Sequence, residues 1–539
     1  MANNFFKQIQ VKVPNRSGED LSFQHLLTTK CGTLVPILWH EVIPGTKVYL
    51  KDAISASLPP LASDTFMRCR LKLESFFVPK RQLAGGFQYW LTGVKVLNPS
   101  TNLEEPAQIP LANVTNLRLA GPGSLADYLG FKIDSLIPGH SGGFIPEPVN
   151  AFPFICYHWI WDQMYRNSKI QKRAFSVPSY SAPVSASNMK AAYLPYINSS
   201  TSVIELGGSD SSSILADGKS LSELRQRNFD IDYFTTATPN PQSVTNPAAI
   251  QFTVDDQGNG EFTIAALRAQ NSLQQYLERQ NLAGFRLTEY VKANYGVNLS
   301  EGLAQMPLFL GRQSLDVYSK GVESTANVAG STQNPFAGTT AARYGSAYAV
   351  GNDTLIDDFE AKEPGIIMVM CSMVPKVTYA SGIDRLLLHH TSQDSQVDIP
   401  NPLLQNVGQQ PIYKKELHCM PTPGVFGYTD RFAEFMCKTD KVSGLLRDTQ
   451  SLQSFALQRS FLGESAPVIS SSFIEIPTNY MDQVSAVAGD ISNYGIWIDS
   501  YFEFKISHPL HAYSIPSLQD PAYEHGKGVI IDRSGQVIS

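Results

Sequence analysis

The sequence predicts a mainly β protein, folded as one β-sandwich with large inserted loops and a few helices. Three observations support this prediction. Short segments that alternate apolar and polar residues recur along the 539 residues, helical periodicity is confined to a few places, and the longest segments between them are dominated by Ser, Thr, Ala and Gly. The chain contains no internal repeat. Residues 1–539 are therefore predicted to form a single domain with insertions.

Two segments alternate strictly enough to predict half-buried strands. In residues 68–74, Arg-Cys-Arg-Leu-Lys-Leu-Glu, charged and apolar side chains alternate, as they must when one sheet face is packed and the other meets water. Residues 496–506 repeat the pattern near the other end of the chain. One parity there is apolar (Ile496, Ile498, Phe502, Phe504 and Ile506), and the other holds Trp497, Asp499, Glu503 and Lys505.

A buried strand and a hairpin are also predicted. Residues 365–374 form a continuous apolar run between Pro364 and Pro375, which fits a strand packed on both faces. Residues 251–264 are predicted to form a hairpin, because Asn259-Gly260 supplies a turn that accepts positive φ. The alternating residues on its two arms are Phe252 and Val254, then Phe262 and Ile264.

Helical spacing appears in three segments. The first lies around residues 273–277 and the second at 287–295, and with Gly284 between them they predict a helical hairpin inserted among the strands. Gly296 follows the second segment, where a left-handed C-cap is wanted. The third segment, residues 151–169, is aromatic on nearly every side. This pattern predicts a helix enclosed by other elements or by another subunit.

Two long segments, residues 198–220 and 321–352, are predicted to be flexible surface loops. Both are rich in Ser, Thr, Ala and Gly and hold few large apolar residues that could anchor them to a core. Connections of this length usually carry function or lie disordered. We expect these two loops to be the first places cut by a protease, because loop tips are the usual sites of cleavage.

Composition narrows the classes of function. Charged residues make up 17% of the chain, against a usual figure of about 25%, which indicates that much of the surface faces other protein. The formal net charge is -6, from 42 basic and 48 acidic residues. This balance argues against a protein that neutralises nucleic acid by bulk positive charge, so any DNA contact must be local.

Two groups of residues are candidates for such local DNA contacts. The N-terminal segment interleaves aromatic and basic residues, the mixture that stacks on bases and pairs with phosphates in single-strand binders. The polar face of the predicted strand at 68–74 supplies the second group. The candidates are Lys7, Lys12 and Arg16, which accompany Phe5 and Phe6, and Arg68, Arg70 and Lys72. The alternative is a solvated or subunit-facing polar surface.

The sequence predicts free thiols and no cofactor or metal site. Six cysteines are scattered without a CxxC pair, which favours a reducing compartment over a disulfide framework or a zinc site. His418-Cys419 is the one sequence-adjacent His/Cys pair, but adjacent residues of a strand point to opposite faces. No apolar run approaches membrane-spanning length, and the N-terminus lacks an apolar export signal, so we expect a protein made and kept in a cytoplasm or released by lysis. The cysteines are Cys31, Cys69, Cys156, Cys371, Cys419 and Cys437.

No pattern makes a strong case for an enzyme. Residues 139–143, Gly-His-Ser-Gly-Gly, fit the G-x-S-x-G motif literally, but they lie in a turn-rich stretch and not between a strand and a helix. Residues 255–260 carry oxygen ligands yet lack the spacing of an EF-hand, so a hairpin turn is preferred to a cation site. His389-His390 is interpreted as the end of a strand.

Seven segments together resemble one family of structural proteins. They resemble, in order, segments of the major capsid proteins of microviruses, small icosahedral single-stranded DNA bacteriophages, and most closely the gokushovirus-like branch. The most informative is Gly-Tyr-Thr-Asp-Arg-Phe-Ala-Glu-Phe-Met-Cys at 427–437, which continues to residue 447. The seven segments are 76–93, 151–167, 228–242, 273–297, 365–387, 427–447 and 508–518.

The resemblance implies an eight-stranded antiparallel jelly roll with large inserted loops. It also implies a major capsid protein, located in the virion and assembled in the host bacterial cytoplasm, whose copies form a T=1 icosahedral shell around a circular single-stranded DNA genome. Because the subunit is acidic overall, a small basic DNA-binding virion protein is expected as a partner, and a host cell-surface receptor is expected to meet an inserted loop. The chain departs from its relatives at His511 and Ser517, and residues 520–539 form a C-terminal extension.

Two other classes of protein stay open at this stage. A β-sandwich surface protein that binds glycans would carry exposed aromatic platforms in its loops, whereas the long loops here are rich in Ser, Ala and Thr. A hydrolase with an inserted lid would depend on Ser141. We predict a structural protein without enzymatic activity.

Overall fold

The structure is a computed structural model, and it describes the main body of the chain with several gaps. The described residues are 17–84, 87–93, 95–98, 103–106, 111–114, 121–131, 149–175, 203–206, 215–239, 253–254, 260–261, 264–283, 286–300, 302, 304–324, 342–388, 400–403, 405, 408–418, 424–461, 467–487 and 489–510.

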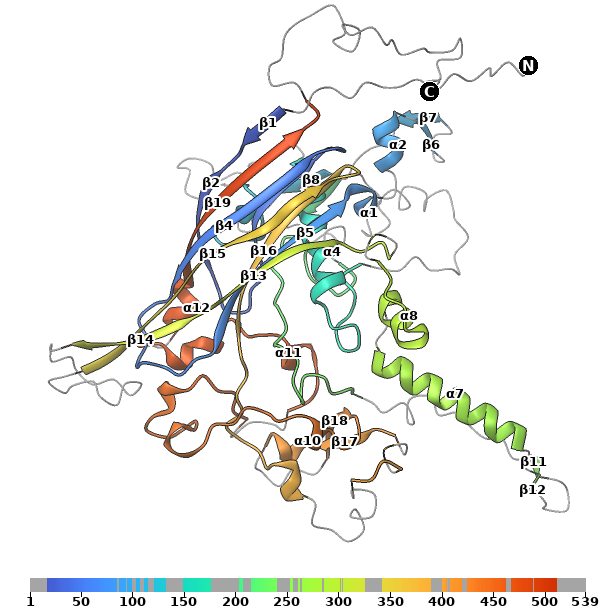
Figure 1. The fold of residues 1–539 in the computed structure, drawn as a ribbon, viewed down its shortest axis with the longest axis vertical. Helices are drawn as coiled ribbons and strands as arrows, with labels where there is room; N and C mark the ends of the chain where they lie inside the picture. Colours follow the sequence, from blue (N-terminus) through green and yellow to red (C-terminus); the bar gives the residue numbers. More distant parts are fainter. Residues whose placement is uncertain are drawn as a thin grey trace, which may run out of the picture.

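Two antiparallel sheets form the centre of the molecule (Figure 1). The larger has the strand order β1-β19-β4-β15-β14, with β2 also paired to β19, and the smaller has the order β13-β5-β16-β3. The larger sheet comprises β1 (Ser17–Asp20), β2 (Phe23–Thr29), β4 (Lys47–Ser57), β14 (Tyr318–Ser324), β15 (Ala342–Glu360) and β19 (Ile496–His508). The smaller comprises β3 (Val35–Val42), β5 (Cys69–Pro79), β13 (Leu308–Asp316) and β16 (Gly365–Pro375). The prediction of a mainly β sandwich is confirmed.

The main hydrophobic core lies between these sheets. Leu50 and Ile54 of β4 and Phe502 of β19 belong to the same buried cluster as Leu73 of β5 and Val369 of β16. Along β19 the burial alternates as predicted from residues 496–506, with the apolar parity buried up to Ile506. Strict alternation of this kind fixes the register, because a slip of one residue would turn every apolar side chain to solvent.

A second core covers the other side of the smaller sheet. All residues of β16 are buried, as its continuous apolar sequence predicts. Its odd-numbered residues, such as Ile367 and Val369, face the main core, while Ile366 and Met368 belong to a second cluster built around α4 (Phe152–Ile160). All residues of α4 are buried too, so the prediction of an enclosed aromatic helix is confirmed. A π-helical turn, Trp161–Tyr165, continues it.

The helical hairpin is present and lies apart from the sheets. It consists of α7 (Ile264–Ala283) and α8 (Leu287–Tyr295), and Gly296 ends α8 in the left-handed conformation with φ +68°. The predicted β-hairpin before it is short: β11 (Thr253–Val254) pairs with β12 (Gly260–Glu261). The expectation that Ile264 belongs to the returning strand is wrong, since Ile264 begins α7. In Figure 1, α7 extends away from the sheets towards the lower right.

Both predicted loops contain strands. In the segment 321–352, β14 and β15 form an antiparallel pair in which Gly321 pairs with Gly345, and the residues between the two strands lie outside the described residues. In the segment 198–220, β10 (Val203–Leu206) pairs with β8 (Leu111–Val114). The loop prediction failed for β15 because its buried residues are small: Gly345, Ala347 and Ala349 face inward, so no large apolar residue marks the buried face.

Smaller elements occupy the connections between the main strands. They are α1 (Lys80–Leu83), α2 (Phe87–Thr92), β6 (Lys95–Asn98), β7 (Leu103–Pro106), α3 (Leu125–Tyr128), β9 (Val149–Asn150), β17 (Gln410–Tyr413), β18 (Val425–Thr429), α10 (Ala433–Met436), α11 (Ser471–Ile474) and α12 (Asp490–Tyr494).

Candidate functional site

The described residues among the predicted DNA contacts are Arg68, Arg70 and Lys72, and they differ in exposure. Arg68 and Arg70 are exposed, and Arg70 Nε pairs with Asp316 Oδ1 at 3.0 Å. Lys72 is only 8% exposed, and its Nζ lies 2.8 Å from Asp230 Oδ1. The expectation of a solvent-exposed polar face along 68–74 is therefore wrong beyond Arg70. The other candidates, Lys7, Lys12 and Arg16, lie outside the described residues.

The buried charges of β5 are explained by the segments packed over them. Glu74 Oε2 accepts hydrogen bonds from Arg227 Nη1 and from the hydroxyl of Tyr165, both at 2.6 Å, and Arg312 Nε donates to Oε1 at 2.7 Å. Burial alone would raise the pKa of Glu74, but Arg227 and the other donors outweigh it, so the pKa lies below its ordinary value. Glu74 is thus an ionised, fully paired carboxylate that joins three distant segments to the strand.

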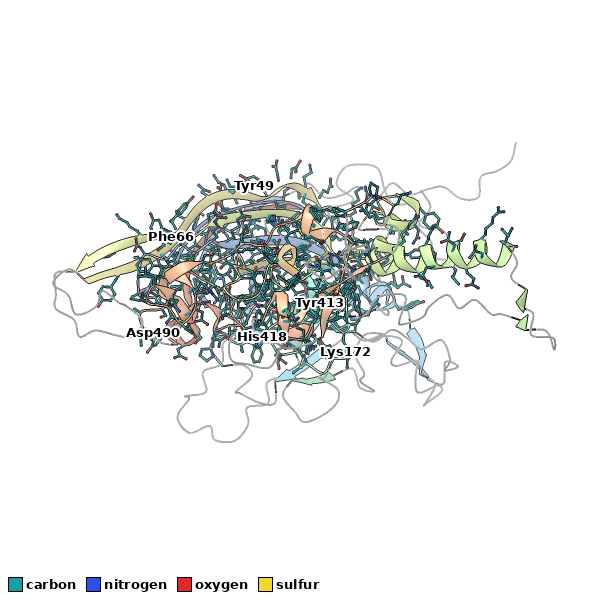
Figure 2. The ribbon with its side chains drawn as sticks, turned by 90° about the horizontal axis from the view of Figure 1, so that it is seen from below. Tyr49, Phe66, Lys172, Tyr413, His418 and Asp490 are labelled. Carbon is teal, nitrogen blue, oxygen red and sulfur yellow. The ribbon has the colours of Figure 1, made fainter. Side chains whose placement is uncertain are left out.

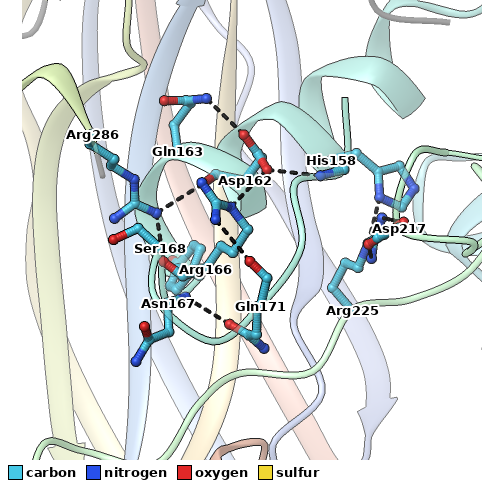
Figure 3. A network of polar contacts seen from close by, with 12 residues as sticks. His158, Asp162, Gln163, Arg166, Asn167, Ser168, Gln171, Asp217, Arg225 and Arg286 are labelled. Carbon is cyan, nitrogen blue, oxygen red and sulfur yellow. Dashed lines mark hydrogen bonds and ion pairs between the residues drawn. The ribbon is translucent and has the colours of Figure 1, made fainter. Parts of the chain in front are cut away.

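A second polar network ties the segment 215–239 to α4 (Figure 3). Arg225 is completely buried and forms an ion pair with Asp217. Its Nε donates to His158 Nδ1 at 2.9 Å, and its guanidinium lies over the ring of Trp161 at 4.3 Å. A planar guanidinium can donate from its edge to His158 and Asp217 while its face lies over Trp161, which the ammonium group of a lysine could not do.

His158 is held as a neutral imidazole in this network. Its Nε2 lies 2.8 Å from the carbonyl oxygen of Leu221, which only accepts, so Nε2 carries the proton while Nδ1 accepts from Arg225. Burial lowers the pKa of His158 well below its ordinary value, and the positive charge of Arg225 lowers it further. Both ring nitrogens are therefore occupied, and the imidazole is not free to act as a base towards a ligand.

Arg286 joins the helical hairpin to the same region (Figure 3). It immediately precedes α8, and its Nη2 donates to the carbonyl oxygens of Asp162 at 3.0 Å and Arg166 at 2.6 Å, at the end of the π-helical turn. Those carbonyls lie where a helix leaves its last acceptors unpaired, so a cation is favoured there. Asp162 itself forms a buried ion pair with Arg166 at 2.9 Å.

The networks around Glu74 and Arg225 consist mainly of buried and half-buried side chains that pair with one another. Their carboxylates are paired with arginines, and in the described part of the chain no group of three or more His, Cys, Asp or Glu side chains is placed to hold a metal ion. His418 is buried without a hydrogen-bond partner for either ring nitrogen. The sequence candidates 139–143, 255–259, 389–390 and Cys419 lie outside the described residues. The described cysteines are free thiols: Cys31, Cys69, Cys156, Cys371 and Cys437.

The outward face of the larger sheet is a broad surface that carries a row of exposed aromatic residues. Trp497, Ser57 and Tyr348 lie side by side across three neighbouring strands, and Tyr318 continues the row onto β14. All four of these side chains are exposed. Figure 2 shows Tyr49 on the same outward side of the sheet. Exposed aromatic residues around small ones are typical of surfaces that contact other proteins.

The helical hairpin offers the second large exposed surface. Ile264, Leu267 and Leu273 of α7 are exposed, and α8 contains no buried residue. Sequence analysis missed Arg225 and Arg286 as anchors because their partners lie elsewhere in the chain, and no local pattern marks them. The exposure of α7 could have been anticipated, because its apolar residues do not follow a single helical stripe.

Comparisons with known proteins agree on one family. The sequence model of the family described as "Capsid protein (F protein)" matches residues 7–518 of this chain. The chain is also similar to the capsid protein VP1 of Chlamydia phage 1, with 25% identity over 614 aligned positions that cover 96% of this chain and 98% of that protein. None of the helices in the described part of the chain is long and apolar enough to cross a membrane.

Proposed function

Because this chain belongs to the capsid F-protein family of bacteriophages, we propose that its copies assemble into a T=1 icosahedral shell around a circular single-stranded DNA genome. The chain is a structural major capsid protein of the gokushovirus-like type and is located in the virion. The observation that carries the proposal is the family match over residues 7–518, which takes in both sheets and the helical hairpin.

We propose further that the sandwich is an eight-stranded jelly roll. Its sheets would be β2-β19-β4-β15 and β3-β16-β5-β13, with β1 and β14 as additions to the edges of the first. The observed pairing order supports this assignment, because consecutive strands such as β2 and β3, or β15 and β16, lie in opposite sheets. A chain that passes repeatedly from one sheet to the other is characteristic of this architecture.

Assembly is supported by the surfaces as well as by the family. The exposed face of the larger sheet and the helical hairpin both present apolar side chains, while charged residues are fewer than usual in the chain. Interfaces between subunits are depleted in charge and enriched in aromatic residues.

Gel filtration and negative-stain microscopy of the purified protein test the assembly. We expect pentamers or closed particles over a range of salt and pH. A stable, monodisperse monomer at high concentration under all these conditions would overturn the proposal. The same experiment separates a capsid subunit from a glycan-binding surface protein, which would stay small and bind a glycan array as a monomer.

The acidic net charge of the subunit leads us to propose partners for the shell. With 42 basic and 48 acidic residues, the subunit cannot neutralise a packaged genome, so a small basic virion protein or cations are proposed to do so. The subunit itself is proposed to add a few contacts from Lys7, Lys12, Arg16, Arg68 and Arg70. A host cell-surface receptor is a further proposed partner, and no enzymatic activity is proposed.

A further inference from the structure

We propose that the helical hairpin of α7 and α8 is an assembly arm that packs against a second copy of this chain, and that α7 is stably folded only when that copy is in place. The inference rests on the proposed function as a shell subunit. Beyond that function, it identifies α7 and α8 as the element that contacts a neighbouring subunit. It also states that α7 is not stably folded before assembly.

The first observation is that α7 has no core of its own. The helix is 20 residues long, which corresponds to about 30 Å. None of its side chains that the structure describes is buried, and Ile264 is 69% exposed at the end of the arm. Most of the stability of a protein helix comes from packing one face against other elements, and here the described chain supplies little of that packing.

The second observation is that the exposed residues suit a protein partner. Exposed apolar residues of α7 lie on more than one side of the helix: Ile264 and Leu267 near its start, and Leu273 and Tyr276 further along. Its charged residues are Arg268, Glu278 and Arg279, so the helix has a formal charge of +1. A surface with so little charge is poorly suited to bind DNA phosphates and well suited to a protein interface.

The third observation is that the arm is attached to the body mainly by polar contacts at its base. Arg286 donates to the carbonyl oxygens of Asp162 and Arg166, and Ser168 Oγ donates to Glu289 Oε2 at 2.9 Å. Within the hairpin, the hydroxyls of Tyr276 and Tyr290 are 3.3 Å apart. These contacts fix α8 to the body and leave α7 to project from it (Figure 1).

A second copy is the occupant that these observations favour. A closed shell brings each subunit against several identical neighbours, and an arm about 30 Å long that projects beyond its own sheets is long enough to reach one of them. Because the arm differs from the sheet surfaces, the contact is expected to be heterologous, which is the type that closes into rings around symmetry axes.

Hydrogen–deuterium exchange of the isolated subunit and of assembled particles tests the inference. In the isolated subunit, α7 amides are expected to exchange about as fast as an unstructured segment, while β16 stays protected; in particles, α7 exchange is expected to slow by about tenfold or more. Equal exchange of α7 in the two states would overturn the inference but leave the proposed function intact. Protection of α7 that appears only on addition of single-stranded DNA would also overturn it.

A pair of lysine substitutions on α7 gives an independent test. Leu267→Lys replaces an exposed apolar side chain by a charge, while Ser272→Lys replaces a polar one and places the same charge about 140° around the helix, near Arg268 and Arg279. We expect Leu267→Lys to lower the assembled fraction about fivefold or more and Ser272→Lys to change it less than about twofold. Unchanged thermal unfolding of both isolated variants would show that the body is intact. Equal assembly of the two variants, whether high or low, would contradict the inference.

Discussion

Asp52 is a carboxyl group placed in the middle of the main core. It lies on the inward-facing parity of β4, between Leu50 and Ile54, and is fully buried. Ser500 Oγ donates to its Oδ1 at 2.5 Å, while its Oδ2 has no hydrogen-bond partner in the described structure. Burial raises the pKa of Asp52 from 3.8 to about 6, and the hydrogen bond from Ser500 opposes that rise.

This raised pKa makes the stability of the subunit depend on pH. Because the folded pKa exceeds the unfolded one, the contribution of Asp52 is fully favourable below about pH 4 and is lost as pH rises to about 6. The shift corresponds to about 3 kcal/mol. In Asp52→Asn, which cannot ionise, this loss is absent. We expect the unfolding free energy of the variant, relative to the wild type, to increase by about 3 kcal/mol between pH 4 and pH 7.

Urea unfolding of the isolated subunit across this pH range measures the difference. Asp353→Asn is the matched control, because Asp353 pairs with Asp52 across the ladder but is exposed. A difference between Asp52→Asn and wild type that does not change with pH would show that Asp52 is not the titrating group.

Among single residues, the sequence predicted exposure well for apolar positions and poorly for charged ones. Arg70 and Lys72 look equivalent in an alternating strand, yet Lys72 is covered because Asp230, far along the chain, supplies its partner. The same holds for Glu74 with Arg227 and Arg312. A buried ion pair depends on tertiary neighbours, and these leave no signal in the local sequence.

At the scale of elements, β15 shows how close packing selects residues that sequence patterns overlook. A Cβ atom at Gly345 would lie 2.0 Å from the backbone oxygen of Ser63. A Cβ at Gly351, six residues along the same strand, would instead meet the end of the Leu315 side chain at 2.1 Å. A backbone oxygen held in a turn cannot move aside as a leucine side chain can.

The two glycines therefore make a matched pair of substitutions. We expect Gly345→Ala to destabilise the subunit by about 1–3 kcal/mol, because either Ser63 or β15 must shift. Gly351→Ala is expected to cost less than about 1 kcal/mol, because Leu315 changes rotamer. Urea denaturation of the isolated subunits measures both values. Equal costs at the two positions would mean that backbone contact at Gly345 does not decide the packing of this strand.

Elements with strong periodicity or strong apolar character were predictable. The buried run of β16, the alternation of β19, the enclosed helix α4 and the hairpin of α7 and α8 all follow from residue spacing. Residues 321–324 of β14 and 342–352 of β15 were predicted as loop, and within this part of β15 the buried positions are filled by Gly and Ala. Small residues allow strands to pack closely. However, Gly and Ala differ too little in hydrophobicity from their polar neighbours for the alternation of a strand to be recognised in the sequence.

At the scale of the whole molecule, the net charge of the subunit predicts weak binding to single-stranded DNA with a shallow dependence on salt. Two or three phosphate contacts per subunit would give a slope of about -1.4 to -2.1 for the logarithm of affinity against the logarithm of salt concentration, at about -0.7 per contact on a single strand. Changing Lys7, Lys12 and Arg16 to Ala is expected to flatten this slope, since these residues supply most of the proposed contacts. Fluorescence anisotropy with labelled single-stranded DNA over a salt series measures it.

The control for this prediction removes the same amount of charge from elsewhere. Lys320, Lys362 and Lys438 are exposed, and their joint change to Ala should leave the slope within about half a unit of the wild-type value. A slope as steep as about -5, or tight binding that survives the N-terminal changes, would reveal a basic surface hidden by the overall charge.

The function of the whole molecule was predictable from the sequence only through family resemblance. Composition and periodicity led to a β-sandwich with surfaces for other proteins, and they left a glycan-binding protein possible. The seven segments that resemble microvirus capsid proteins decided between these classes, and the family match over residues 7–518 agrees with them. Residues 273–297 of the assembly arm are among the seven segments, but nothing in their sequence marks them as an interface, because that inference rests on the lack of buried side chains around the arm in the folded subunit.

The position of β19 determines when the larger sheet can form during translation. This strand lies between β2 and β4 in the larger sheet, although residues 58–495 separate it from β4 in the sequence. While the ribosome is still translating those residues, β2 and β4 have exposed backbone edges and no partner between them. The sheet closes only after residue 508 has emerged. A chain that ends before residue 496 lacks the strand between β2 and β4, so we expect it to form no complete larger sheet and to stay out of the particle.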